Sequence, residues 1–150
     1  MDLKLSGSES VPASKEKVWA FINDPNAVAS CLPDVLDVTV HDPHHFDATV
    51  KVAVGPVSGK FKFKIALEPQ PDGDHVVLRI GGGRLGSVVD LVATAEIKPV
   101  DASSTSLDWN ATAQARGPIA TVGGRVLEAQ ANRVIGTTFA NVRTKLTEAA

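Results

Sequence analysis

The segment from Pro118 to about Glu148 constrains the fold most, because no other stretch of the sequence can form a long helix. Proline is well suited to the first turn of a helix, and no further proline follows Pro118. Apolar residues recur every three or four positions along this segment: Leu127, Ala131, Ile135, Phe139, Val142 and Leu146. A helix of this length extends about 45 Å. Its apolar stripe therefore needs a broad apolar surface to cover it.

The rest of the sequence predicts mainly β-strands, which would form that surface. A first strand is predicted from Leu3 to Val11, and two short helices follow it, one capped by Ser14 and one from Pro25 to Cys31. Later segments alternate apolar and polar residues, which is the period of a strand with one buried face. Six further strands are predicted: Val35–Val40, Phe46–Val54, one around 60–68, Asp74–Gly81, Val88–Val100 and Thr105–Ala115.

The strand around 60–68 shows the clearest alternation. Its apolar residues Phe61, Phe63, Ile65 and Leu67 interleave with Lys60, Lys62, Lys64 and Glu68. One face of the sheet is thus expected to be buried and to face the long helix, while the other face is exposed to solvent. The predicted fold class is α+β, with an antiparallel sheet of about seven strands wrapped around the C-terminal helix, in one domain spanning residues 1–150.

Charge and cysteine content exclude several classes of function. A net charge of -2 and a pI near 6.0 give no electrostatic reason to expect nucleic-acid binding. The single cysteine cannot form an intrachain disulfide, and no apolar run approaches the roughly 20 residues of a membrane span. We expect a cytoplasmic protein, with a peripheral position at the inner face of the cell membrane left open.

Several short motifs resemble one family. Val11-Pro12-Ala13 with Val18-Trp19, then Asn23-Asp24-Pro25 and Cys31-Leu32-Pro33, are similar to the opening of the G-subunit family of carbon monoxide dehydrogenase. The stretch from Phe46 to Val57, with Lys60-Phe61, resembles the central hairpin of that family, and the last helix resembles its counterpart more loosely. Asp34 stands where members of the family usually carry glycine. The family is a branch of the SRPBCC, or START/Bet v 1-like, helix-grip superfamily.

This resemblance implies a non-catalytic accessory protein with an apolar cavity between sheet and helix. It also implies a lipophilic ligand such as a quinone, a lipid or a fatty acyl chain, with no covalent cofactor. The expected partners are that small molecule and a membrane-associated molybdenum hydroxylase or CO dehydrogenase-type redox complex. The alternatives are a cyclase- or hydrolase-like enzyme using the same cavity, and a pure interaction module.

Residue size suggests where such a ligand would bind. Small residues at inward positions of the last two predicted strands, such as Ala111 and Ala113, face small residues at the start of the long helix, such as Gly123. Either the helix packs closely there, or a space remains for an apolar ligand. The expected ligand-binding residues are Phe63, Leu91, Trp109, Ala111, Ala113, Ile119, Val122, Gly123 and Val126.

Other chemically suggestive features have simpler interpretations. Residues 81–86 match the GxGxxG pattern, but a strand follows them where a dinucleotide-binding loop requires a helix. No base or orienting group accompanies Cys31, which we expect to be buried. His44 and His45 point to opposite faces of a predicted hairpin, which does not suit a metal site. The row of Lys60, Lys62 and Lys64 is interpreted as a solvated strand face, with contact to anionic lipid or an acidic partner as the alternative.

Overall fold

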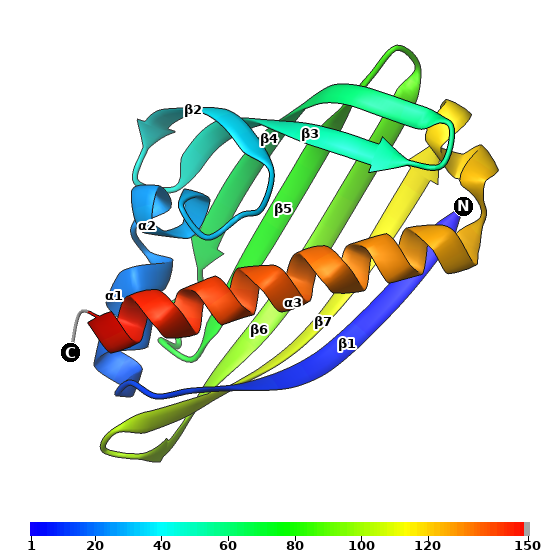
Figure 1. Cartoon of the computed structure of the whole chain (residues 1–150). Helices are drawn as coiled ribbons and strands as arrows, with labels where there is room; N and C mark the ends of the chain where they lie inside the picture. The colour runs from blue at the N-terminus through cyan, green and yellow to red at the C-terminus, as the bar shows by residue number, and fades with distance from the viewer. Residues whose placement is uncertain (149–150) are drawn as a thin grey trace.

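The structure is a computed structural model, and it describes residues 1–148. The elements in chain order are β1 (Asp2–Val11), α1 (Lys15–Ile22), α2 (Pro25–Ala29), β2 (Val35–Asp42), β3 (His45–Val54), β4 (Val57–Pro69), β5 (His75–Arg84), β6 (Ser87–Asp101), β7 (Ser104–Arg116), the 3₁₀ helix η1 (Gly117–Val122) and α3 (Gly124–Glu148). The seven strands form one antiparallel sheet in the order β1-β7-β6-β5-β4-β3-β2. This sheet curves around α3, as Figure 1 shows, so the predicted helix-grip fold is confirmed.

The two short helices begin where the sequence predicted. Ser14 accepts a hydrogen bond from the Lys17 N–H at the start of α1, and Asp24 accepts bonds from the first turn of α2. Such side-chain caps satisfy helix N–H groups that have no partner within the helix. The second helix ends at Ala29, two residues before the predicted end at Cys31. Element ends of this kind are the least certain part of a sequence-based prediction.

The two faces of β4 differ in burial as the sequence predicted. Lys60, Lys62 and Lys64 are exposed, whereas Phe61, Ile65 and Leu67 are buried and Phe63 is half-buried. Phe61 and Phe63 belong to a cluster that includes Leu127 of α3, as predicted. The expectation that all four apolar residues face this helix needs correction at Ile65 and Leu67. These two pack with Phe46 of β3 and Ala29 of α2, because α2 covers that part of the curved sheet.

The prediction of one continuous helix from Pro118 is wrong. The chain forms η1 first, and α3 begins only at Gly124. Gly123 lies between them with φ of 95°, a conformation that an α-helix does not allow. The buried Ser87 hydroxyl accepts a hydrogen bond from the Ile119 N–H at 3.0 Å, and this bond ties η1 to the start of β6. Tertiary packing of Ile119 thus overrides the helical periodicity.

The glycine cluster after Ile80 lies within a strand, which corrects the prediction that this strand ends at Gly81. β5 continues to Arg84 and turns directly into β6. A Cβ on Gly82 would collide with the carbonyl oxygen of Lys62, and one on Gly83 with that of Ser87. Glycine is therefore required for close approach of neighbouring backbones and not for flexibility. No helix follows the GxGxxG pattern, so it does not form a dinucleotide-binding loop.

Asp34 adopts φ of 61°, a left-handed conformation that glycine accepts most readily. Aspartate is among the side chains that tolerate this conformation best. The Asp34 carbonyl oxygen accepts a hydrogen bond from the Lys51 N–H at 2.9 Å, and its carboxylate lies 3.0 Å from the Arg133 guanidinium of α3. The residue thus links the turn before β2 to both the sheet and the long helix.

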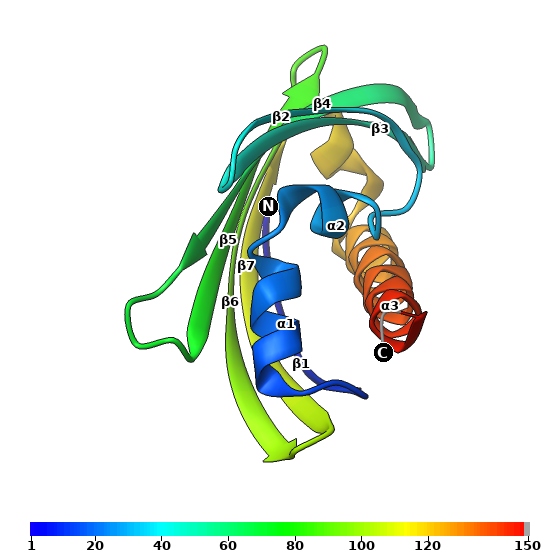
Figure 2. The same ribbon diagram turned by 90° about the vertical axis from the view of Figure 1, so that its left-hand side faces the viewer.

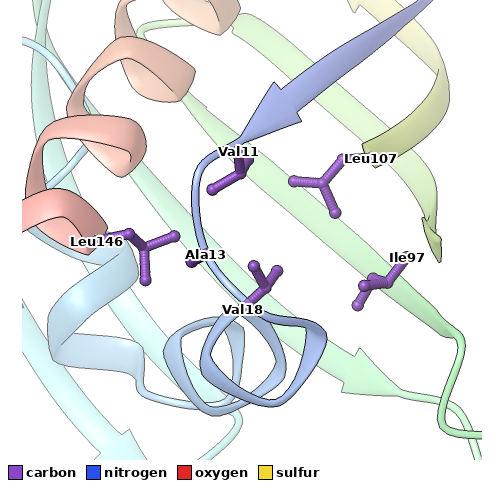
Figure 3. Packing of buried hydrophobic residues seen from close by; sticks show 6 residues of the cluster. All are labelled: Val11, Ala13, Val18, Ile97, Leu107 and Leu146. Atoms are coloured by element: carbon purple, nitrogen blue, oxygen red, sulfur yellow. The ribbon is translucent and has the colours of Figure 1, made fainter. Parts of the chain in front are cut away.

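A buried cluster fixes α1 against the sheet and the end of α3. Figure 3 shows its members pointing toward one another: Val11, Ala13, Val18, Ile97, Leu107 and Leu146. Thr105 is fully buried beside them and donates a hydrogen bond from its hydroxyl to the Ala13 carbonyl oxygen at 2.8 Å. A buried hydroxyl without a partner would be destabilising, so this bond makes Thr105 compatible with the core.

Candidate functional site

The long helix contacts the sheet mainly along its two sides. α3 approaches the edge strand β1 most closely and also approaches β3, whereas its backbone contacts with the central strands are sparser. Figure 2 shows α3 running along the concave side of the sheet, opposite β5, β6 and β7. The helix therefore bridges the sheet without packing closely against its centre.

Side-chain burial along α3 supports this description. Among the α3 side chains that the structure describes, only Leu127 and Leu146 are buried, and they lie near opposite ends of the helix. The larger apolar residues between them are half-buried, including Ile135 and Phe139. In a closed core these positions would be shielded completely.

The facing strands show the same incomplete burial. Inward positions at the centre of the sheet are half-buried, namely Phe63, Leu78, Ile80, Leu91, Ala93, Ala95 and Trp109. We call these residues, together with Ala131, Ile135 and Phe139 of α3, the inner groove. All of these side chains are apolar apart from the indole N–H of Trp109. Apolar side chains that stay partly exposed are a surface that a lipophilic small molecule would cover.

Trp109 and Phe139 form the aromatic part of the groove. Their rings stack with centroids 6.4 Å apart and an interplanar angle of 27°. Trp109 lies against Gly7 of β1, where a Cβ would come within 2.8 Å of the indole. Glycine at that position thus lets the ring lie flat on the sheet. The indole Nε1 is buried and has no hydrogen-bond partner within residues 1–148, so the ring contributes apolar area and leaves one donor unsatisfied there.

Two buried clusters close the ends of the groove. At one end Ile119 of η1 and Leu127 of α3 pack with Val54, Phe61 and Ala115. At the other end Leu146 packs in the cluster with Val11 and Val18. The open part of the groove therefore lies between two anchored ends of the helix.

The sequence-predicted ligand residues do not all occupy equivalent positions. Phe63, Leu91 and Trp109 line the groove, and Ala111 and Ala113 lie on the same face but are only 3% and 8% exposed. Ile119 and Val122 belong to the cluster at the η1 end. Gly123 is the junction between η1 and α3. Val126 is 44% exposed on the first turn of α3, so it contributes less to a wall than the sequence suggested.

Sequence reasoning missed an ion pair beside the groove. The Glu9 carboxylate of β1 accepts a hydrogen bond from the Arg143 guanidinium of α3 at 3.0 Å. Glu9 occupies an inward position of β1, where its neighbours Leu5 and Val11 are apolar. This break in the alternation was the available signal. Both side chains are partly exposed, so the pair contributes little to the free energy of unfolding. Its effect is to link α3 to β1.

The histidines lie apart from the groove. His41 lies 2.9 Å from Asp47, and His45 lies 2.9 Å from Asp42, in exposed pairs around the β2–β3 hairpin. Within residues 1–148, no three side chains among histidine, cysteine, aspartate and glutamate are placed to hold a metal ion.

Cys31 is fully buried, as the sequence predicted. Its thiol donates a hydrogen bond to the Ala27 carbonyl oxygen at 3.4 Å. Burial raises the pKa of the Cys31 thiol, and a hydrogen bond with Ser30 and the charge of Lys145 oppose that rise more weakly. The thiolate, which is the nucleophilic form, is therefore disfavoured in the folded protein.

We expect Cys31 to react with a thiol reagent at least about tenfold more slowly in the folded protein than in urea, because both access and ionisation are reduced. Time-resolved labelling with a chromogenic disulfide at neutral pH measures both rates. Equal rates in the two conditions would contradict the buried, protonated state described here.

Two hollows lie outside the inner groove. The larger, about 610 Å³, lies on the outer face of the sheet and is lined in part by Lys64, Arg79 and Asp90. The smaller, about 370 Å³, lies between α2 and β2. Both are open to solvent, and no residue of α3 lines either of them.

Comparison with known proteins identifies the class of this fold. A conserved protein from Geobacillus kaustophilus has a similar structure, with a TM-score of 0.88 at 20% identity, covering 98% of this chain and 97% of that one. A START superfamily protein from Mycobacterium smegmatis matches with a TM-score of 0.76 at 15% identity, over 98% and 99% of the two chains. The ZhuI aromatase/cyclase from Streptomyces sp. R1128 matches with a TM-score of 0.68 at 16% identity, over 98% and 94%. The fold is that of the START/SRPBCC superfamily.

A family model narrows this class. The model for the G subunit of carbon monoxide dehydrogenase (CoxG) matches residues 7–147, and the chain belongs to this family. The comparison with curated proteins gave no match. None of the helices within residues 1–148 combines the length and apolar character needed to cross a bilayer.

Proposed function

We propose that this protein binds a lipophilic small molecule, a quinone or an acyl lipid, in the inner groove and does not catalyse a reaction on it. The single observation that carries the proposal is the half-buried apolar centre of the sheet beneath α3. A helix that contacts the sheet at its sides and ends leaves apolar surface that an apolar ligand would cover.

The chemistry of the groove supports binding over catalysis. Its ten lining residues carry no acid, base or hydroxyl group. Glu9 and Arg143 at its margin are bonded to each other, which reduces their availability for proton transfer. An aromatase/cyclase shares the fold, but at 16% identity this likeness concerns architecture alone.

Family membership suggests the physiological setting. We propose that the protein serves as an accessory to a membrane-associated molybdenum hydroxylase or CO dehydrogenase-type complex, and the proposal is supported by the family, which is named after a subunit of carbon monoxide dehydrogenase. In that setting we propose a quinone as the ligand. The aromatic pair of Trp109 and Phe139 offers flat surfaces for a planar ring.

Purified protein is expected to carry, or to take up, such a ligand. Native mass spectrometry, followed by organic extraction and chromatography with absorbance detection, distinguishes a quinone from a fatty acid. Added quinone or fluorescent acyl probe should bind in a saturable manner. A protein that emerges ligand-free and takes up neither probe would contradict the proposal, and turnover of an added polyketide mimic would favour the enzymatic alternative.

A further inference from the structure

One end of the molecule differs from the rest in its charge and its exposed apolar residues. Three segments meet there: residues 51–60 around the β3–β4 turn, residues 82–89 around the β5–β6 turn, and residues 115–126 around η1. They contain five basic residues and no acidic residue, in a chain that has 15 basic and 17 acidic residues overall. The five are Lys51, Lys60, Arg84, Arg116 and Arg125. We call this region the basic end.

Direct contacts hold the three segments of the basic end together. The backbone of Gly117 packs against that of Gly86, and Val122 contacts Gly55, where a Cβ would lie 3.4 Å away. The Arg84 guanidinium lies over Gly59 of the neighbouring strand. Figure 1 shows the β5–β6 turn, the β3–β4 turn and η1 at the same end of the sheet, away from α1.

Most of the positive charge at the basic end is not neutralised. Arg116 forms an ion pair with Asp90 at 2.9 Å, and both side chains of this pair are exposed. Lys51, Lys60, Arg84 and Arg125 have no carboxylate within ion-pair distance among the described residues. At the opposite end, Asp72 and Asp74 lie in the β4–β5 turn and Asp101 ends β6, and Asp74 is paired there with Lys15.

Leu85 belongs to the basic end and lies in the β5–β6 turn. It is 82% exposed at the tip of the β5–β6 turn, more than any other large apolar side chain among the described residues. Its φ of 47° is unfavourable for leucine, whereas glycine or asparagine would adopt it readily. Pro56, Pro118 and Val126 are also exposed nearby. The fold thus exposes the Leu85 side chain to water and holds the Leu85 backbone in a conformation that is unfavourable for leucine.

We propose that the basic end docks onto a bilayer containing anionic lipid, with Leu85 entering the interface and the surrounding cations contacting phosphate groups. An exposed apolar side chain at the same end of the fold as unpaired basic ones matches the arrangement of a membrane surface, in which headgroups lie outside the acyl region. Anionic headgroups supply the negative charge that the four unpaired cations lack. An acidic protein would satisfy the cations but gives no role to a single projecting leucine. This inference rests on groups outside the inner groove and does not require the groove to be filled.

The outer row of Lys62 and Lys64 is less suited to this contact. Lys64 lies opposite Asp47 in the β3–β4 register and shares the outer hollow with Asp90. No apolar side chain exposed as fully as Leu85 accompanies this row. The basic end therefore gives a more specific position for lipid contact than the row identified from the sequence.

Flotation of the full chain with vesicles tests the proposal. Vesicles of phosphatidylcholine with added phosphatidylglycerol should bind the protein, and vesicles of phosphatidylcholine alone should bind it at least about tenfold more weakly. Leu85→Asn should weaken binding about tenfold while leaving the protein as stable as before or more stable, because asparagine accepts the backbone conformation. Val100→Asn is the matched control, since Val100 is 65% exposed at the opposite end. It should leave binding unchanged.

Charge reversal tests the second part of the contact. Arg84→Glu with Arg125→Glu should reduce vesicle binding by more than tenfold, and Lys62→Glu with Lys64→Glu should reduce it much less. Failure of the wild type to bind anionic vesicles would overturn the proposal. Charge dependence without an effect of Leu85→Asn would also overturn it, because it would indicate a purely electrostatic contact of the kind an acidic protein makes. Uptake of a soluble fluorescent probe without vesicles measures ligand binding separately.

Discussion

Ala93→Phe is expected to abolish uptake of a quinone or acyl probe while changing the free energy of unfolding by less than about 1 kcal/mol. Ala93 is a half-buried inward residue of β6, between Leu78 of β5 and Ala111 of β7. An added ring would extend into the inner groove, where it would occupy the space of a ligand. Probe titration monitored by fluorescence, together with urea unfolding, measures the two effects.

Val92→Phe is the matched control for this experiment. Val92 precedes Ala93 on the same strand, points to the outer face and is 37% exposed. The same ring added there should leave probe uptake unchanged. A loss of about 1 to 3 kcal/mol in Ala93→Phe, with no probe bound by the wild type, would instead indicate a close-packed core. That result would favour the interaction module over the binding protein.

The sheet could be predicted because its signal is local. The alternation of Phe61, Ile65 and Leu67 with lysines has the strand period, and burial of one face fixes the register. Short-range signals of this type also located both short helices through Ser14 and Asp24. The motifs shared with the CoxG family then specified how the elements assemble.

The break at Gly123 could not be predicted in the same way. Residues 118–122 are compatible with a helix by composition, and what prevents it is a contact made from a distance. The Ser87 hydroxyl accepts a hydrogen bond from the Ile119 N–H, and Gly117 packs against Gly86. These contacts hold residues 117–122 in the 3₁₀ helix η1, so α3 begins only after them. Long-range contacts of this kind leave no periodic signal in the segment they reshape.

The candidate site was predicted in outline and not in detail. Small residues on β6 and β7 indicated the sheet face beneath α3, but Ala111 and Ala113 are buried there, and Ala93 and Ala95 are the more accessible pair. Which alanine borders free space depends on how the sheet curves beneath α3, and residue size alone does not determine this. The pairing of Glu9 with Arg143 depends on the same curvature, because it joins residues 134 positions apart.

Gly117→Ala is expected to lower the free energy of unfolding by roughly 2 to 5 kcal/mol, because two costs combine. Gly117 has φ of 81°, a conformation in which an L-residue with a Cβ is strained. The new methyl group would also collide with the carbonyl oxygen of Gly86, which belongs to the backbone and cannot rotate away. Either the β5–β6 turn or η1 must shift. Urea unfolding followed by tryptophan fluorescence measures the loss.

Two other glycines separate the contributions to this loss. Gly123 has φ of 95° and ψ of 152°, a backbone region that essentially only glycine adopts, with open space around a would-be Cβ, so Gly123→Ala should show the strain alone, about 1 to 3 kcal/mol. Gly136 lies within α3, has no neighbour near its would-be Cβ and is exposed, so Gly136→Ala should stabilise the protein by about 0.5 to 1 kcal/mol. Equal losses for Gly117→Ala and Gly123→Ala would contradict the collision. Because Gly117 also positions η1 beside Leu85, its variant should weaken vesicle binding in addition, whereas Gly136→Ala should not.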